Sequence, residues 1–284
     1  MRDQGNIALA VAVLLAWTPV VVALFRVLGR RNGTLVAVIG GYLLLPPIIV
    51  SLPGRFHGVI FGKQGAIGLA LAVAMLVWDA KTLSKFRPRP LDVPALAIMV
   101  WAVFVTLFGQ YVEWDVAAAV LSQRVWWLVP YLAARLYFGD AEGARRIGVG
   151  VVVASLGLVP AVGFESLLGP SWFLRTLIYR LPSQGAMRLG GWRPEVFCNH
   201  GIELSSWLAL AGVVALWLWL GRAWRPRWGP AWWPSFLLIL ATAVTRDVYG
   251  YLDLLLGTVV VTLTLVLRTR AAIIALAMMA PILI

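Results

Sequence analysis

The chain has 284 residues, of which 61% are hydrophobic and only 13% charged, and its formal net charge is +12. A soluble domain carries about 25% charged residues, so this composition excludes an ordinary soluble protein, and it excludes a disordered chain as well. The single Cys198 excludes a disulfide scaffold. The composition predicts an all-α, polytopic transmembrane bundle, because the apolar segments are too long and unbroken for barrel strands.

Ten apolar stretches follow one another along the chain, and a membrane span needs about 20 residues. In chain order they are Gln4–Phe25, Asn32–Gly54, Phe56–Trp78, Val93–Val112, Val116–Phe138, Ile147–Phe164, Leu204–Gly221, Trp228–Thr245, Val248–Leu267 and Ala271–Ile284. The tenth has only 14 residues, and as a helix of about 21 Å it is shorter than a hydrocarbon core of about 30 Å.

We therefore expect about ten helices, the last of them incomplete. Residues 1–284 are expected to form a single integral membrane domain that is the N-terminal part of a longer one. A short re-entrant helix over Ala271–Ile284 is the alternative.

The connectors between these spans carry unequal positive charge. One alternate set holds 15 Lys and Arg residues and the other, with the N-terminus, holds 8; the richer set is Arg26–Gly33, Asp79–Pro90, Arg135–Arg146, Gly221–Arg227 and Arg268–Arg270. The positive-inside rule places the richer set in the cytoplasm. Because membrane topology accounts for the basic residues, nucleic acid is not expected as a partner.

The longest connector, Glu165–Glu203, is predicted on the outer side, although it contains four arginines: Arg175, Arg180, Arg188 and Arg193. Positive charge on this side opposes the usual bias, and an anionic ligand is one explanation, because guanidinium groups bind phosphate oxygens in bidentate fashion. Pairing with acidic residues or with lipid headgroups is the other.

The densest part of this connector is MRLGGWRPEVFCNHGIE, Met187–Glu203. Gly190 and Gly191 permit positive φ angles and the close approach of a ligand. Arg188 and Arg193 stand on either side of the two glycines, five residues apart. This arrangement makes the two arginines candidate ligands for phosphate.

His200 and Glu203 are candidate catalytic residues in the same segment, and they share a helical face if the helix begins near Cys198. A histidine can act as a general base or hold a phosphate, whereas a hydrogen-bonded structural histidine is the alternative. The chain has 2 histidines and 1 cysteine, too few for a metal-binding cluster, so no metal is expected.

Two further arginines lie in or beside predicted spans. Arg246 belongs to TRDVYGYLD, Thr245–Asp253, and Arg124 lies within the span Val116–Phe138. An arginine at membrane depth costs about 2.5–3.5 kcal/mol, so each should face a cavity or a partner. Arg124 is therefore expected to point inward, and Asp247 or Asp253 is the alternative partner that would neutralise Arg246.

Four stretches of the sequence resemble the O-antigen ligase-related family in their order and spacing. They are PYLAARLYFGDAEGARR (Pro130–Arg146), GFESLLGPSW (Gly163–Trp172), RLGGWRPEVFCNHGIELSSW (Arg188–Trp207) and TRDVYGYLDLLLG (Thr245–Gly257). The family consists of bacterial membrane proteins that transfer glycans in surface polysaccharide assembly, as ligases or polymerases. The Arg-Leu-Gly-Gly-Trp-Arg-Pro block is the most specific part of the resemblance.

The resemblance implies a multi-pass protein of the bacterial inner membrane that acts on the periplasmic face without metal, cofactor or nucleotide sugar. Its donor would be an undecaprenyl-pyrophosphate-linked glycan, and its acceptor a glycan, the lipid A core or a protein. Arg188 and Arg193 match the pyrophosphate-binding arginines of the family's GG-x-RP block, and Arg246 matches the arginine of its later motif. The family's acceptor histidine belongs to a later loop that has no counterpart here, so His200 is not equated with it.

Two other functions remain open from the residues alone. A transporter or flippase of lipid-linked glycan precursors would also use inward arginines, although transporters generally show internal repeats and none is found here. A non-catalytic membrane scaffold, in which each arginine balances an acidic residue, is the third.

Overall fold

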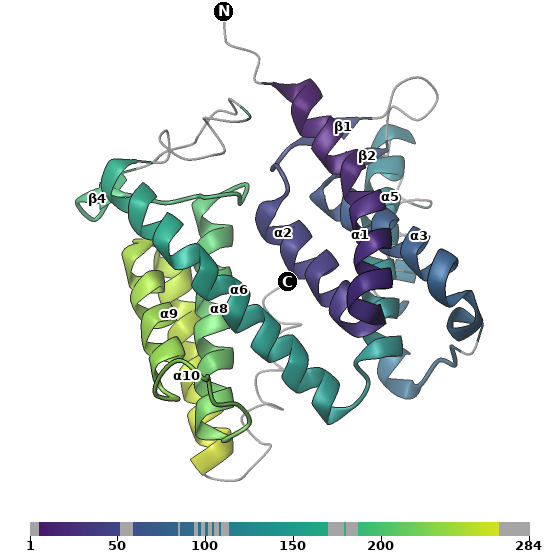
Figure 1. Cartoon of the computed structure of the whole chain (residues 1–284). Coiled ribbons are helices and arrows are strands. Elements are labelled where there is room, and N and C mark those ends of the chain that lie inside the picture. Colours follow the sequence, from purple (N-terminus) through teal and green to yellow (C-terminus); the bar gives the residue numbers. More distant parts are fainter. Residues whose placement is uncertain are drawn as a thin grey trace, which may run out of the picture. The chain divides into compact units, whose positions relative to one another are not determined.

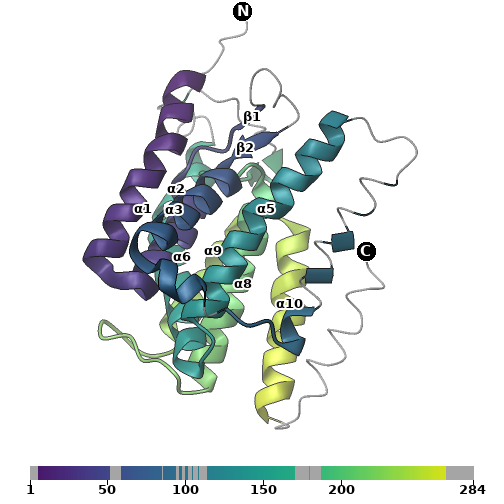
Figure 2. The ribbon, with the colours of Figure 1, turned by 90° about the vertical axis from the view of Figure 1, so that its right-hand side faces the viewer.

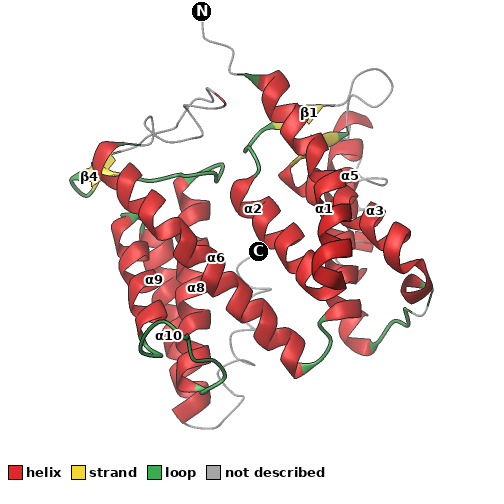
Figure 3. Ribbon diagram, viewed as in Figure 1, coloured by secondary structure: helices red, strands yellow, loops and turns green. Residues whose placement is uncertain are grey.

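The computed structural model describes residues 6–51, 59–84, 86–93, 96–97, 100–101, 104, 108, 114–169, 179 and 187–266. These residues are predominantly helical, with two short two-stranded ribbons (Figures 1 and 3). The chain divides into two compact units, Met1–Gly143 (unit 1) and Ala144–Ile284 (unit 2). The expectation of a single integral domain stays a prediction.

Five helical stretches in the described ranges are long and apolar enough to cross a membrane. They are Ile7–Leu44, Lys63–Leu83, Ala141–Leu168, Gly201–Leu220 and Val248–Leu265. The chain is thus an all-α, multi-pass membrane protein, as its composition predicts.

The described residues do not show the ten expected spans. The helix over Trp233–Val244 has only 12 residues, and the helix that the fifth predicted span forms is not among the five. Most of Val93–Val112 and all of Ala271–Ile284 lie outside the described residues.

Unit 1 begins with a helical hairpin. Helix α1 (Ile7–Leu35) reverses at Gly29, whose φ of 74° is a conformation that glycine adopts without strain. After the turn, Gly33 lies against Phe25, and Trp17 Nε1 donates to the Ala37 carbonyl at 3.3 Å. A π-helical turn η1 (Val36–Gly40) and the short α2 (Gly41–Leu44) complete the returning arm.

The rest of unit 1 packs on this hairpin. Strand β1 (Ile49–Ser51) pairs with β2 (Ile60–Gly62) in antiparallel fashion, and β2 leads directly into α3 (Lys63–Leu83). Helix α3 contacts α1 on one side and α5 (Trp114–Tyr137) on the other (Figure 2). Gly68 allows the close approach of α5, because a Cβ there would lie 3.0 Å from the Trp126 carbonyl oxygen.

Ion pairs join three of the basic connectors at one end of unit 1. Arg30 pairs with buried Asp79 at 3.0 Å, and Arg31 pairs with Asp140 at 2.9 Å. Tyr137 also donates its hydroxyl to Asp79, at 3.0 Å. Alternation of the connectors predicts that Arg26–Gly33, Asp79–Pro90 and Arg135–Arg146 share one side, and the structure places their described parts together.

A second polar cluster surrounds Asp92, which ends the short 3₁₀ helix η3 (Pro90–Asp92) and is fully buried. The carboxylate accepts hydrogen bonds from the Arg135 guanidinium, the Tyr131 hydroxyl and the Arg89 backbone N–H. These three donors, Arg135 first, hold the pKa of Asp92 well below its ordinary value of 3.8.

Unit 2 is built around α8 (Gly201–Leu220). Helix α6 (Ala141–Leu168) runs antiparallel to it, and Trp207 Nε1 of α8 donates to Ser155 Oγ of α6 at 2.9 Å. Helices α9 (Trp233–Val244) and α10 (Val248–Val266) pack on other faces of α8 (Figure 1). A short hairpin, β3 (Met187–Arg188) and β4 (Gly191–Trp192), lies between α6 and α8 in sequence.

The bounds of α6 and α8 correct the predicted connector Glu165–Glu203. Helix α6 continues to Leu168, and α8 begins at Gly201. Charged residues define the predicted limits, but Glu165 is fully buried within α6 and Glu203 lies in the first turn of α8.

Candidate functional site

The β3–β4 hairpin presents Arg188 at the end of unit 2 where α6 ends and α8 begins. Leu189 and Gly190 form its two-residue turn with φ angles of 48° and 75°. A two-residue turn with positive φ at both central residues has a backbone twist that matches the twist of the two paired strands. The register places Arg188 opposite Gly191, and the Arg188 side chain is exposed.

Gly191 provides the surface on which Arg246 lies. A Cβ at position 191 would stand 2.3 Å from Arg246 Cζ, so any larger residue there displaces the guanidinium. Arg246 Nη1 donates to Ser166 Oγ and to the Trp192 carbonyl oxygen, each at 2.8 Å. Both acceptors are neutral, and the described residues supply no carboxylate to this half-buried guanidinium.

Arg193 is held differently, because it is buried with an acidic partner. Only 4% of Arg193 is exposed, and its Nη2 lies 3.4 Å from Oδ2 of the fully buried Asp247. The Arg193 side chain crosses Gly201, where a Cβ would lie 2.3 Å from Nε. Asp247 was expected as a possible partner of Arg246, and it neutralises Arg193 instead.

Two atoms of this ion pair lack hydrogen-bond partners. Arg193 Nε and Asp247 Oδ1 are buried and make no hydrogen bond in the described part of the chain. Unmade hydrogen bonds of charged groups are costly in a buried site, so this ion pair is the polar contact in unit 2 that depends most on its surroundings.

The structure gives His200 and Glu203 separate partners. His200 is exposed and stands immediately before α8, with Nδ1 at 3.4 Å from Arg193 Nη2. Glu203 Oε2 accepts from the backbone N–H of Asn199 at 2.8 Å and from its Nδ2 at 3.0 Å. Glu203 therefore orders the chain that enters α8, and the helix begins three residues later than Cys198.

Glu165 and Ser166 were not singled out from the sequence, although they shape the site from α6. Glu165 Oε2 accepts the backbone N–H groups of Glu195 and Val196 at 2.7 and 2.8 Å, which fixes the loop that follows Arg193. Ser166 accepts from Arg246. In the sequence they are an acidic residue and a hydroxyl at the end of an apolar run. Polar groups in that position need hydrogen-bond partners within the protein, and this is the signal that could have identified them.

Arg124 does not fulfil the expectation that it points inward. It belongs to unit 1 and is exposed on α5. Trp126, two residues later, contacts Gly65 and Gly68 of α3. At about 100° per residue the two side chains point in widely different directions, so Arg124 turns away from α3. Arg175 and Arg180 lie outside the described residues.

The comparisons with known proteins give one partial similarity. No family model matches the chain, and no solved structure matches it significantly. An alignment of 152 residues is 30% identical to ABC transporter C family MRP4 of Zea mays and covers 49% of this chain. The chain spans only 10% of the length of that protein.

The three arginines at this end of unit 2 thus have three distinct environments. Arg193 is buried and neutralised, Arg246 is half-buried with neutral partners, and Arg188 is exposed on the hairpin that Arg246 contacts. Two permanently charged guanidinium groups, one on this hairpin and one packed against it, are suited to bind an anion with more than one charge.

Proposed function

We propose that this chain is a membrane glycan-transfer protein of the bacterial inner membrane, similar to O-antigen ligases and polymerases. It binds an undecaprenyl-pyrophosphate-linked glycan on the periplasmic face and passes the glycan to another glycan, the lipid A core or a protein. The observation that carries the proposal is the half-buried Arg246, which is held by two neutral oxygens beside the hairpin that bears Arg188.

Arg246 and Arg188 bind the diphosphate in this proposal. Arg246 is positioned before the donor arrives, because Ser166 and the Trp192 carbonyl orient its guanidinium. Neutral acceptors leave the full positive charge in place. Arg188 lies on the exposed β3–β4 hairpin and contacts the second phosphate of the diphosphate.

Arg193 is a positioning residue rather than a phosphate ligand. Its pairing with Asp247 joins the chain just after β4 to the turn between α9 and α10. Trp192 and Arg246 are the sequence neighbours of this pair. The ion pair therefore sets the distance between the Trp192 carbonyl and the Arg246 backbone.

The transfer step breaks the bond between the anomeric carbon and the diphosphate oxygen while an acceptor hydroxyl oxygen bonds to that carbon. The bonding electron pair leaves with the diphosphate, and the arginines stabilise the charge that develops there. The hydroxyl proton passes to a base. Of the predicted catalytic residues, exposed His200 is the better candidate, because Glu203 is occupied by Asn199.

The test is glycan transfer by Arg246→Ala and Arg188→Ala variants in membranes that contain the lipid-linked donor. Arg246→Ala removes a charged hydrogen-bond donor that stabilises the transition state. We expect it to reduce the rate of glycan transfer about 10²–10³-fold. Arg227→Ala, which removes an exposed arginine at the other end of α8, is the matched control. Normal transfer by both site variants at normal membrane levels refutes the assignment.

The alternative is a transporter or flippase of lipid-linked glycan precursors. The partial similarity to a protein named as an ABC transporter favours it. The same arginines would then carry the diphosphate across the membrane without breaking a bond. Flipping of a fluorescent lipid-linked glycan in proteoliposomes, with no glycan transfer under the same conditions, would support this alternative over the first proposal.

A further inference from the structure

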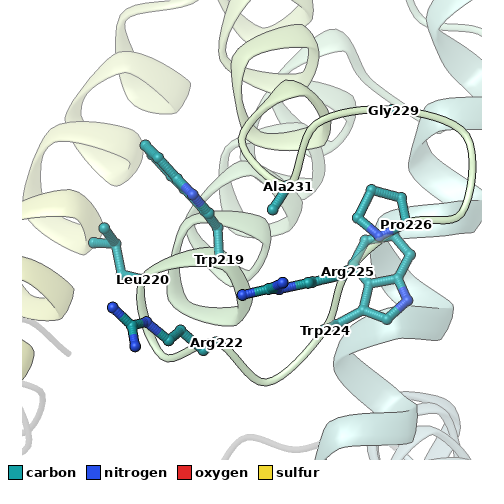
Figure 4. Close-up of a pocket in the computed structure, with 8 residues that line it drawn as sticks. All are labelled: Trp219, Leu220, Arg222, Trp224, Arg225, Pro226, Gly229 and Ala231. Carbon is teal, nitrogen blue, oxygen red and sulfur yellow. The ribbon is translucent and has the colours of Figure 1, made fainter.

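A cavity of about 470 Å³ lies at the opposite end of unit 2, in the loop between α8 and α9. It is lined by Trp219, Leu220, Arg222, Trp224, Arg225, Pro226, Gly229 and Ala231 (Figure 4). Helix α8 has 20 residues, from Gly201 to Leu220, a length of about 30 Å. The cavity is therefore separate from the arginine site that adjoins the start of α8.

The backbone places Arg222 in a position where glycine is preferred. Arg222 has a φ of 51°. Its N–H donates to the Trp219 carbonyl at 3.0 Å, and the Ala223 N–H donates to the Leu218 carbonyl at 2.9 Å. These two bonds define a Schellman motif, whose left-handed residue is usually glycine. An arginine held there against its backbone preference points to a role for the side chain.

Arg222 and Arg225 have no acidic partner in the described part of the chain. Both residues are exposed, and no acidic side chain in the described ranges pairs with either. Backbone N–H groups of residues 221–223 already satisfy carbonyls at the end of α8, so the arginines are not needed as helix caps. The segment Gly221–Trp232 contains three arginines and no acid.

Aromatic side chains surround the loop. Trp228 and Trp232 are 56% and 47% exposed, and Trp219 and Leu220 form an apolar wall of the cavity. In Figure 4 the Arg225 side chain extends from the loop toward the end of α8, where this wall lies. Tryptophan side chains favour the headgroup region of a bilayer.

We propose that this cavity binds the phosphate of an acidic phospholipid headgroup. Arg222 and Arg225 contact the phosphate oxygens, and Trp219 and Leu220 pack against the first carbons of the lipid. A lipid fits better than a free phosphate, because the cavity combines two guanidinium groups with an apolar wall beside exposed tryptophans.

The experiment measures lipid binding by the purified full chain in neutral detergent, with native mass spectrometry after addition of phosphatidylglycerol or phosphatidylcholine. The wild-type chain is expected to retain phosphatidylglycerol preferentially. Arg222→Gly, which suits the left-handed turn, and Arg225→Gln are each expected to weaken this binding about tenfold or more, because each removes a charge-assisted hydrogen bond. The melting temperature in phosphatidylcholine confirms that both variants fold.

Arg227→Ala is the matched control, because it removes the same charge from the same loop but does not line the cavity. It is expected to weaken binding at most about fivefold, through long-range attraction that salt screens. The proposal is overturned if Arg227→Ala loses as much affinity as the other two, or if neither of those loses any. It is also overturned if inorganic phosphate binds with the same arginine dependence while the two lipids bind equally, since the site then takes a soluble anion.

Discussion

The guanidinium group of Arg246 lies across the Cα of Gly191, so closely that a methyl group at position 191 would stand 2.3 Å from Cζ. The two residues are far apart in the sequence, yet the size of the residue at position 191 decides where the Arg246 guanidinium can lie. The second glycine of the Gly-Gly pair is required by a neighbouring arginine, whereas the first is required by its own positive φ of 75°.

Gly191→Ala should therefore displace Arg246 from Ser166 and from the Trp192 carbonyl. We expect the loss of these two hydrogen bonds of a charged group to lower the free energy of unfolding by about 1–3 kcal/mol, and we expect at least a tenfold loss of glycan transfer under the proposed function. Gly157→Ala is the control, because a Cβ there meets nothing within 4 Å. Equal stability and activity of the two variants would contradict the assigned role of Gly191.

Removing one member of the buried ion pair should destabilise unit 2 strongly. Asp247→Ala leaves Arg193 charged and buried, so we expect the free energy of unfolding to fall by about 3–5 kcal/mol in a chemical unfolding experiment. The double variant Arg193→Met, Asp247→Leu buries no charge and should recover most of this loss. If the double variant is as unstable as Asp247→Ala, the unpaired charge of Arg193 is not the cause of the loss.

The buried carboxylate of Asp92 should make unit 1 sensitive to acid. Its pKa is lowered in the folded chain, first by the Arg135 guanidinium, so its contribution to stability is present above the ordinary value of 3.8 and is lost as the pH falls through the lower folded pKa. Asp92→Asn should lower the melting temperature at pH 7, and the difference from wild type should narrow only below about pH 4.

Asp140→Asn is the comparison for Asp92. Its pKa is also lowered, first by the Gly143 backbone N–H, but its side chain is 53% exposed. Solvent screens its pairing with Arg31, so a smaller loss of melting temperature is expected at pH 7. An equal loss of melting temperature in the two variants would show that the burial of Asp92 does not increase its contribution to stability.

The packing of α10 on α8 depends on Gly250. A Cβ there would lie 1.8 Å from Ser205 Oγ and 2.9 Å from Ser205 Cβ, so Gly250→Ala must push the helices apart. We expect a loss of about 1–3 kcal/mol in the free energy of unfolding. Ser205→Gly should restore part of it, whereas Gly163→Ala, which meets nothing within 4 Å, should have little effect.

The helical class of the fold could be predicted because lipid leaves the backbone few alternatives. An apolar run must satisfy its own N–H and C=O groups, so α6, α8 and α10 occur where the runs occur. Span limits were less predictable. A charged residue at the edge of an apolar run predicts the end of a span, but Glu165 is buried inside α6, where it accepts backbone N–H groups of the following loop.

The candidate site could be predicted in its position but not in its pairing. Neighbouring connectors bring Arg193 and Arg246 to the same end of unit 2, as the topology implies. Asp247 is adjacent to Arg246 in the sequence, yet it pairs with Arg193. Adjacent side chains point in different directions, so an acid beside an arginine in the sequence does not identify its partner.

The turn at Gly29 has a consequence for how the chain enters the bilayer. Because the chain reverses at Gly29, and Trp17 donates a hydrogen bond to Ala37 across the turn, the two arms are held antiparallel to each other. Whatever fixes the first arm also fixes the second. The positive charges of Arg26, Arg30 and Arg31 beside this turn therefore orient a pair of helices in a single insertion event.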